Sequence, residues 1–171
     1  MKQTSLNNSS SKTRSLKNSG LIWLIVTIAV FVIDIMSKFI IHHTFYYGES
    51  IRLFSFFSIS YRRNTGAAFS ILEGQRGLLA IVAVVISIFI IYMLYKNGRH
   101  KKFENFSLAL ILGGALGNLF DRIYHGYVID FFDVNFGTWH YPTFNLADCA
   151  ICVGIACFIW ASCKTHNKES S

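Results

Sequence analysis

Proline and charged residues are both scarce in this sequence. The single proline is Pro142, and charged residues make up 15% of the 171 residues while hydrophobic residues make up 53%. Because proline interrupts helices, its near absence is compatible with long unbroken helices. So little charge excludes an ordinary soluble composition, and the mean hydropathy of +0.42 indicates a membrane protein of one domain.

Metal-binding and disulfide patterns are also missing. The six histidines have no ligand spacing, and the sequence contains no HExxH motif and no glycine-rich phosphate loop. All four cysteines lie in one apolar run, which excludes the framework of a disulfide-rich secreted domain. Cys149 and Cys152 have CxxC spacing without a second pair nearby, so we interpret them as packing residues and expect neither a metal nor another cofactor.

Basic residues outnumber acidic ones by 16 to 9, which gives a formal net charge of +7. They lie in short clusters between apolar runs and form no continuous face. This distribution argues against nucleic acid as a partner and favours membrane lipid with anionic headgroups.

Four apolar runs are long enough to cross a bilayer, which requires about 20 residues of helix. They cover residues 21–43, 78–95, 103–120 and 144–163. Ten of the sixteen Lys and Arg residues lie before the first run, after the second and after the fourth. The positive-inside rule therefore predicts that both termini are cytoplasmic.

The expected organisation is a disordered cytoplasmic tail over residues 1–20, a membrane domain over 21–163 and a cytoplasmic tail over 164–171. A signal peptide is the alternative for the N-terminus, but its apolar run is too long and has no small-residue cleavage pattern. Between the spans, residues 51–62 favour short strands on the outer surface, and residues 123–143 are expected to form a second outer loop. Asn64-Thr65-Gly66 is typical of a turn, and residues 67–70 suit a re-entrant segment.

Four of the nine acidic residues lie between Gly117 and Asp148, namely Asp121, Asp130, Asp133 and Asp148. Ionisable residues in or beside a span are costly, so function is the first hypothesis. On a helix, Gly114, Asn118, Asp121 and Arg122 would share one face, and Gly113 with Gly117 would allow a neighbouring helix to approach closely. The alternative is that Asp121 and Arg122 only cap and anchor the helix end.

The other polar residues of the spans form two groups. Asp34 and Lys38 are spaced as an i, i+4 ion pair, for which a structural role is favoured over catalysis by Lys38. A Ser–Lys hydrolase has little support, because Ser37 and Lys38 are adjacent and do not face each other on a helix. In the fourth span one side is expected to face inward. It carries Asn145, Asp148, Cys149, Cys152, Ala156 and Cys163.

Asp130 and Asp148 could converge if the second outer loop folds back. Two carboxyl groups in a partly dehydrated site cannot both ionise cheaply, so one keeps its proton while the other acts as a base. Such a pair can activate water against a peptide carbonyl. The residues alone leave three alternatives open: an aspartyl hydrolase, a proton-coupled transporter and a non-catalytic membrane scaffold.

Five motifs in order resemble the lipoprotein signal peptidases, also called signal peptidase II. They are Asp34-x-x-Ser37-Lys38, Asn64-Thr65-Gly66-Ala67-Ala68-Phe69, Gly117-Asn118-Leu119-x-Asp121-Arg122, Val128-Ile129-Asp130-Phe131 and Phe144-Asn145-Leu146-Ala147-Asp148. The resemblance covers nearly all of residues 21–163. One departure is Ile35, where the family often has Gln.

The resemblance implies an aspartyl protease of the bacterial cytoplasmic membrane, folded as four transmembrane helices with a small outer β-cradle. Its substrates would be prolipoproteins, cut just before a cysteine that carries diacylglycerol, and globomycin-like cyclic peptides would inhibit it. Asp130 and Asp148 would form the catalytic pair. Supporting residues would be Asn64, Asn118, Asp121, Arg122 and Asn145, with Asp34 and Lys38 behind them. We expect a monomer.

Overall fold

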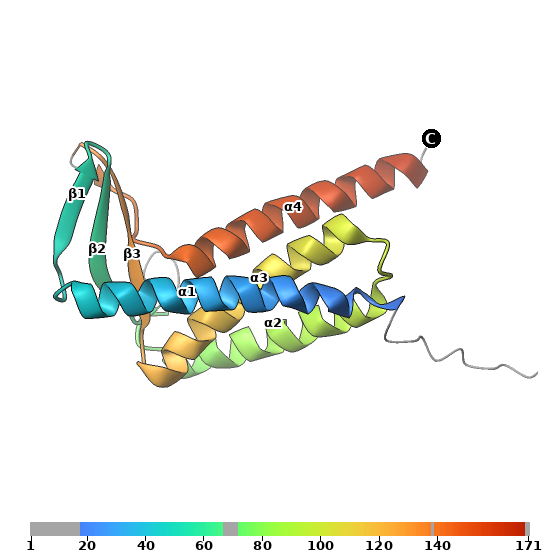
Figure 1. The fold of residues 1–171 in the computed structure, drawn as a ribbon, viewed down its shortest axis with the longest axis horizontal. Coiled ribbons are helices and arrows are strands. Elements are labelled where there is room, and N and C mark those ends of the chain that lie inside the picture. Colours follow the sequence, from blue (N-terminus) through green and yellow to red (C-terminus); the bar gives the residue numbers. More distant parts are fainter. Residues whose placement is uncertain (1–17, 67–71, 138, 170–171) are drawn as a thin grey trace, which may run out of the picture.

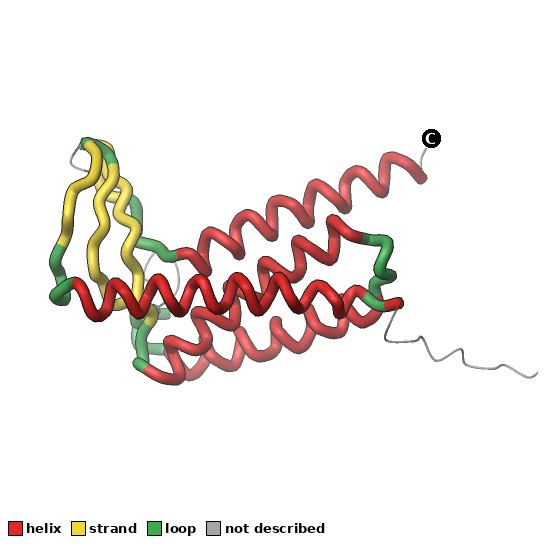
Figure 2. The backbone as a smooth tube through the Cα atoms, in the orientation of Figure 1, coloured by secondary structure: helices red, strands yellow, loops and turns green. Residues whose placement is uncertain are grey.

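Four long helices run side by side, with a small sheet at one end of the bundle (Figures 1 and 2). The structure is a computed structural model that describes residues 18–66, 72–137 and 139–169. A short 3-10 helix, η2 (Gly20–Trp23), leads into α1 (Leu24–Thr44). The other helices are α2 (Arg76–Lys96), α3 (Lys102–Tyr124) and α4 (Leu146–Glu169).

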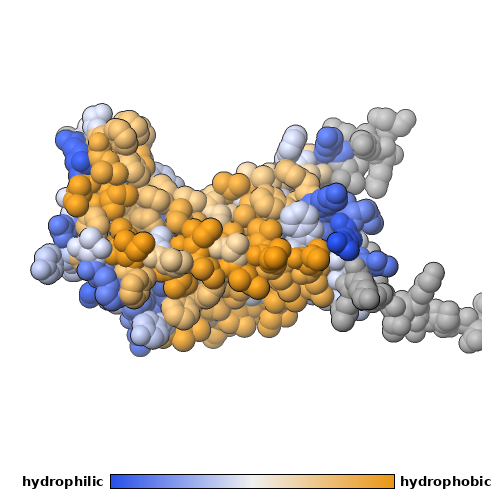
Figure 3. All heavy atoms as spheres, viewed as in Figure 1, coloured by the Kyte–Doolittle hydropathy of each residue, from blue (hydrophilic) through white to orange (hydrophobic). Residues whose placement is uncertain are grey.

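All four helices are long and apolar enough to cross a membrane. Their outward faces remain apolar, as with Ile25 and Ile88, which are 71% and 63% exposed. Figure 3 shows a broad hydrophobic belt along the bundle, with hydrophilic residues toward its ends. The belt fits the hydrocarbon region of a bilayer, and the predicted four-span membrane fold is confirmed.

Helix α3 is the central helix, since it contacts α1, α2 and α4. Its glycines make this possible. A Cβ atom at Gly114 would collide with the carbonyl oxygen of Ala147 in α4, and one at Gly117 would collide with the carboxylate of Asp34 in α1. The predicted close approach at Gly113 and Gly117 is confirmed, and in this bundle the missing side chains let polar groups of three helices meet.

The sheet has the order β1-β2-β3-β4 with antiparallel neighbours. The predicted strands over residues 51–62 are present as β1 (Ser50–Phe54) and β2 (Phe57–Asn64). The second outer loop, however, was predicted without strands and contributes β3 (Val128–Phe136) and β4 (Trp139–His140).

Strand β3 was not predicted because both of its faces are packed. Its residues therefore do not alternate between buried and exposed, and the sequence lacks the alternating pattern of a half-exposed strand. Ile129 and Phe131 belong to a small core with Ile41 of α1 and Tyr61 of β2. This core fastens the sheet to the end of the bundle and fixes the position of Asp130, which lies between the two core residues of β3.

The boundaries differ from the expected ones at both ends. Residues 18–20 were assigned to a disordered tail, but the backbone N–H of Gly20 donates to Asn97 and that of Arg99 donates to Asn18. The structured region therefore begins before Leu21, and residues 1–17 lie outside the described residues. Helix α4 continues through the expected C-terminal tail to Glu169.

The inward-facing stripe predicted for α4 is wrong beyond its first turn. Cys152, Ala156 and Cys163 are exposed, and Cys149 is half-buried. The buried position is Gly154, which lies against the carbonyl oxygen of Ser107 in α3. Close contact through a glycine turns the cysteines away from α3, so they are not core residues.

Candidate active site

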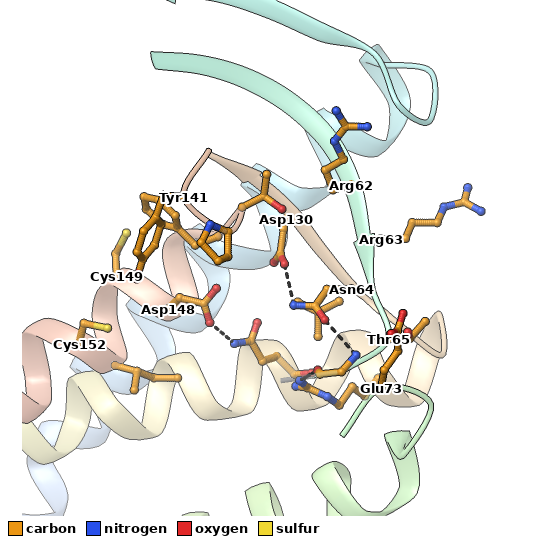
Figure 4. A pocket seen from close by; sticks show the side chains of 18 residues that line it. Arg62, Arg63, Asn64, Thr65, Glu73, Asp130, Tyr141, Asp148, Cys149 and Cys152 are labelled. Atoms are coloured by element: carbon orange, nitrogen blue, oxygen red, sulfur yellow. Dashed lines mark hydrogen bonds between the residues drawn. The ribbon is translucent and has the colours of Figure 1, made fainter. Parts of the chain in front are cut away.

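A cavity of about 600 Å³ lies where the sheet meets the ends of α3 and α4. Asp130 and Asp148 both line it, and Figure 4 shows their carboxyl groups on neighbouring walls of the same space. The predicted convergence of these two residues is therefore confirmed. The re-entrant segment proposed for residues 67–70 lies outside the described residues.

Asp148 is held by the first turn of α4. Its Oδ2 accepts the backbone N–H of Asn145 at 3.1 Å, while the Oδ1 of Asn145 accepts the backbone N–H of Asp148 at 3.0 Å. This reciprocal pair is a capping box, which satisfies donors that the helix leaves open. The other oxygen of Asp148 accepts the Asn118 amide at 2.8 Å. The start of α4 and Asn118 thus fix the orientation of the Asp148 carboxyl group.

Asp130 comes from β3 and is 1% exposed. Its two oxygens accept one amide each, from Asn64 at 2.9 Å and from Asn145 at 2.7 Å. Burial, and then the charge of Asp148, raise the pKa of Asp130 to about 7, although the two amides oppose this change. The two carboxyl groups thus have different environments: Asp148 is half-buried at a helix N-terminus and Asp130 is buried in the sheet.

Asn145 connects the two carboxyl groups directly. Its side-chain amide donates to Asp130, and its backbone N–H donates to Asp148. The same amide lies 3.2 Å from the side-chain oxygen of Asn118. Asn145 is fully buried, so this junction is shielded from solvent and defines the relative position of the two acids.

Behind this junction lies a buried ion network centred on Lys38. Its Nζ lies 2.7 Å from Asp34 and 3.2 Å from Asp121, and it donates to the Oδ1 of Asn118 at 3.0 Å. The predicted structural pairing of Asp34 with Lys38 is confirmed. Because Lys38 supplies a donor to the oxygen of Asn118, the amide nitrogen of Asn118 is turned toward Asp148.

Asp34 and Asp121 each anchor a second element to this network. Asp34 accepts the backbone N–H of Ala147, in the first turn of α4, at 2.9 Å. Asp121 accepts the backbone N–H of Ile129, next to Asp130, at 3.0 Å. Lys38 therefore sets the positions of both carboxyl-bearing segments through its two partners.

Arg122 contacts backbone carbonyl oxygens at the edge of the site. It donates to the carbonyl oxygens of Asn118 at 3.2 Å and Gly66 at 2.9 Å. Its guanidinium lines the cavity and braces the turn that follows β2. The same turn is closed by the Asn64 side chain, which accepts the backbone N–H of Gly66.

Several lining residues were not predicted from the sequence. They include Arg62 and Arg63 of β2, Glu73, and the segment 141–144 that leads into α4. Arg63 stacks over Tyr47 and Tyr127 at 4.9 and 4.8 Å and donates to the hydroxyl of Tyr61. The sequence feature that could have indicated these residues is the pair of arginines immediately before Asn64. Within the described residues no group of three potential ligands is arranged for a metal ion.

Comparison with known proteins gives one consistent result. A family model described as signal peptidase (SPase) II matches residues 26–164. A lipoprotein signal peptidase of Actinobacillus succinogenes is 43% identical over 159 residues, covering 91% of this chain and 98% of the relative. That of Photorhabdus laumondii is 47% identical over 157 residues, covering 90% and 94%.

Solved structures agree with this result. One bacterial membrane enzyme superimposes with a TM-score of 0.80 at 31% identity, covering 86% of this chain and 91% of that one. A second gives a TM-score of 0.73 at 32% identity, covering 82% and 91%. The fold is thus shared with bacterial membrane enzymes along most of the chain.

Proposed function

This chain belongs to the signal peptidase II family, a family of peptidases, and from that premise we propose that it cleaves prolipoproteins by an aspartyl mechanism in which Asp130 and Asp148 act on one water molecule. The cut would fall just before the diacylglyceryl cysteine. Membership of this family supports an activity that removes signal peptides from prolipoproteins. The catalytic type and the position of the cut are the parts that we propose here.

The junction at Asn145 is the observation that carries this proposal. A single buried residue donates to both carboxyl groups, through its amide to Asp130 and through its backbone to Asp148. Two acids fixed in this way can share one water and one proton. Neither a scaffold nor a transporter would need two carboxyl groups at a fixed separation beside a cavity large enough for a peptide.

The different environments of the two acids support the roles that we propose for them. Asp130, whose pKa is raised to about 7, carries the shared proton and acts as the acid. Asp148 receives donors from Asn118 and from the start of α4, and it acts as the base. The two groups titrate as a coupled pair, so these roles describe the pair in its resting protonation state.

The reaction then has two steps. Asp148 removes a proton from water, the water oxygen attacks the scissile carbonyl carbon, and Asp130 gives its proton to the carbonyl oxygen. In the second step Asp148 passes its proton to the amide nitrogen, Asp130 recovers a proton from the hydroxyl group, and the C–N bond breaks. The products are a signal peptide with a free carboxylate and a lipoprotein with a free α-amino group on its cysteine.

The position of the cavity suits a substrate that is anchored in lipid. It opens at the ends of α3 and α4, beside the apolar belt, so a peptide could enter while its acyl chains stay in the bilayer. The polar and aromatic segment 141–144 forms one wall and would limit the access of bulk water. Asn64, Asn118 and Asn145 would hold the acids, while Asp34, Lys38, Asp121 and Arg122 would brace these amides and the chain around them.

The distribution of basic residues supports an orientation for this enzyme. Both described ends of the chain lie at the end of the bundle away from the sheet (Figure 1). At that same end, where α2 leads into α3, lie Lys96, Arg99, Lys101 and Lys102. The positive-inside rule then puts both termini in the cytoplasm and the sheet on the outer face of the bacterial inner membrane.

The decisive experiment is cleavage of a purified diacylglyceryl prolipoprotein, followed by its change in size. Asp130→Asn and Asp148→Asn should each abolish cleavage while the protein still inserts and folds. Asp133→Asn is the matched control, because Asp133 lies on the same strand but binds His140 and does not line the cavity. A globomycin-like cyclic peptide should block the unmodified enzyme. Retained cleavage in either of the first two variants would refute the aspartyl mechanism.

A further inference from the structure

A second cavity lies at the opposite end of the bundle, between the N-terminus of α3 and the C-terminal part of α4. Its volume is about 530 Å³. Its lining includes His100, Lys101, Lys102, Phe103, Glu104, Trp160 and Lys164. Asn118 lies sixteen residues along α3 from Lys102, which corresponds to about 24 Å of helix. The cavity is therefore separate from the candidate active site.

The charges in this cavity favour an anion. Glu104 pairs with Lys101, with 3.0 Å between the ammonium nitrogen and the carboxylate oxygen. That pair is neutral, so Lys102 and Lys164 supply a net charge of about +2 across the cavity from two different helices. A phosphate group is a suitable ligand, because it accepts from several ammonium groups at once.

The aromatic residues show where such a ligand would come from. Phe103 and Trp160 meet edge to face, with their ring centroids 5.3 Å apart, and are 41% and 63% exposed. Lys164 extends over the Trp160 ring at 5.8 Å. Exposed aromatic rings at the end of a spanning helix lie at the level of lipid headgroups. The phosphate in this cavity is thus expected to carry acyl chains that run along the exposed apolar faces of α3 and α4.

We infer that this cavity is a binding site for an anionic phospholipid, whose phosphate lies between Lys102 and Lys164 and whose glycerol contacts Phe103 and Trp160. Basic pockets between spanning helices on the cytoplasmic side recognise lipid headgroups in this way. The lipid would join the start of α3 to the end of α4, where Figure 1 shows α4 extending away from α1 and α2. This inference does not depend on the proposed peptidase mechanism.

Quenching of Trp160 fluorescence by brominated lipid tests the site directly. The full chain carrying Trp23→Phe and Trp139→Phe keeps Trp160 as its single tryptophan. It is reconstituted in phosphatidylcholine vesicles that contain increasing fractions of brominated phosphatidylglycerol or, separately, brominated phosphatidylcholine. We expect half-maximal quenching at a clearly lower fraction of the anionic lipid.

Charge variants then identify the residues responsible. Each lysine near an anionic headgroup contributes about a fivefold factor in affinity, so Lys102→Gln with Lys164→Gln should raise the half-maximal fraction of phosphatidylglycerol by between about fivefold and about 25-fold. The matched control is Lys96→Gln with Arg99→Gln. It removes the same charge from the same end of the bundle, at residues that do not line the cavity.

Three results would overturn the inference. The two brominated lipids could quench equally at every fraction, or both double variants could shift the midpoint equally, which would indicate only a diffuse surface charge. Alternatively, soluble glycerol 1-phosphate could displace the brominated lipid, which would identify a free phosphate as the ligand. Loss of the preference for phosphatidylglycerol in the first double variant alone would establish the site, whether or not the chain cleaves any peptide.

Discussion

Asp130 makes the stability of this protein depend on pH. Its pKa is raised from an ordinary value of 3.8 to about 7 in the folded state, by burial first and by the charge of Asp148 second. Between these two values the folded protein keeps a proton that the unfolded chain has released. The contribution of Asp130 to stability is therefore fully present below the lower value and is lost as the pH rises to about 7. The loss is on the order of 4 kcal/mol at pH 8 but only about 1–2 kcal/mol at pH 5.

Asp130→Asn should remove this dependence. The amide cannot ionise, although it disturbs one of the two hydrogen bonds donated by Asn64 and Asn145, at a cost of about 1–3 kcal/mol. We expect the variant to be close to the unmodified protein in stability at pH 5. By pH 8 its relative stability should have increased by roughly 3 kcal/mol, which corresponds to an unfolding midpoint higher by about 6 °C or more.

The assay is thermal unfolding of both proteins in one detergent, followed by intrinsic fluorescence at several pH values. Asp148→Asn provides the second arm. It removes the charge that contributes to the raised pKa of Asp130, so the window of falling stability should move to lower pH. A midpoint difference between Asp130→Asn and the unmodified protein that stays constant from pH 5 to pH 8 would refute the reasoning.

Four further outcomes are expected. Cleavage should decline about tenfold per pH unit above 7, as Asp130 loses the proton that we propose it donates, and a flat profile of kcat/KM up to pH 9 would contradict that role. Lys38→Met should lower the free energy of unfolding by about 3–5 kcal/mol, because it leaves the buried carboxylates of Asp34 and Asp121 without a counter-charge. An unchanged denaturation midpoint would contradict a stabilising role of this ion network. Asn145→Ala should cost about 1 kcal/mol through the lost helix cap and about 1–3 kcal/mol more through the buried amide lost from Asp130, and it should reduce cleavage about 100-fold. Parallel unfolding and turnover measurements separate the two effects. Gly114→Ala should lower the free energy of unfolding by about 1–3 kcal/mol, because the new Cβ atom would collide with α4. The control is Gly77→Ala, whose added Cβ atom would have no neighbouring atom within 4 Å and should not destabilise the protein. Equal unfolding midpoints of the two variants would exclude the close contact with α4.

The spans and their local ion pair could be predicted because they depend on neighbouring residues in the sequence. An apolar run of about 20 residues identifies a spanning helix by itself, and an i, i+4 spacing brings Asp34 and Lys38 together on any helix. Their observed contact at 2.7 Å needs nothing from the rest of the fold.

The contacts that build the site, in contrast, join residues that are far apart in the sequence. Lys38 reaches Asn118 across eighty residues, and Asp34 reaches the backbone of Ala147 across 113. Composition and periodicity do not encode such pairings, and the resemblance to a family supplied the list of residues without their partners. The strand that carries Asp130 was missed because burial on both faces removes the alternation that identifies a strand.

The predicted inward face of α4, which carried its cysteines, was wrong for a related reason. Small residues on one side of a span predicted an inward face, but the closest packing is made by Gly154 against α3. Helix rotation depends on which side allows the nearest approach of two backbones. In this helix that side is set by one glycine, and the cysteines are left exposed or half-buried.

The capping box of α4 carries a consequence for the biogenesis of the molecule. The atoms that begin this helix also hold Asp148, and the same turn is joined to α1 where Asp34 accepts the backbone N–H of Ala147. A newly inserted chain whose first and last spans have not yet docked would lack an aligned pair of acids. Peptide hydrolysis would therefore require complete assembly of the helix bundle. Incompletely assembled chains would not cleave other membrane proteins.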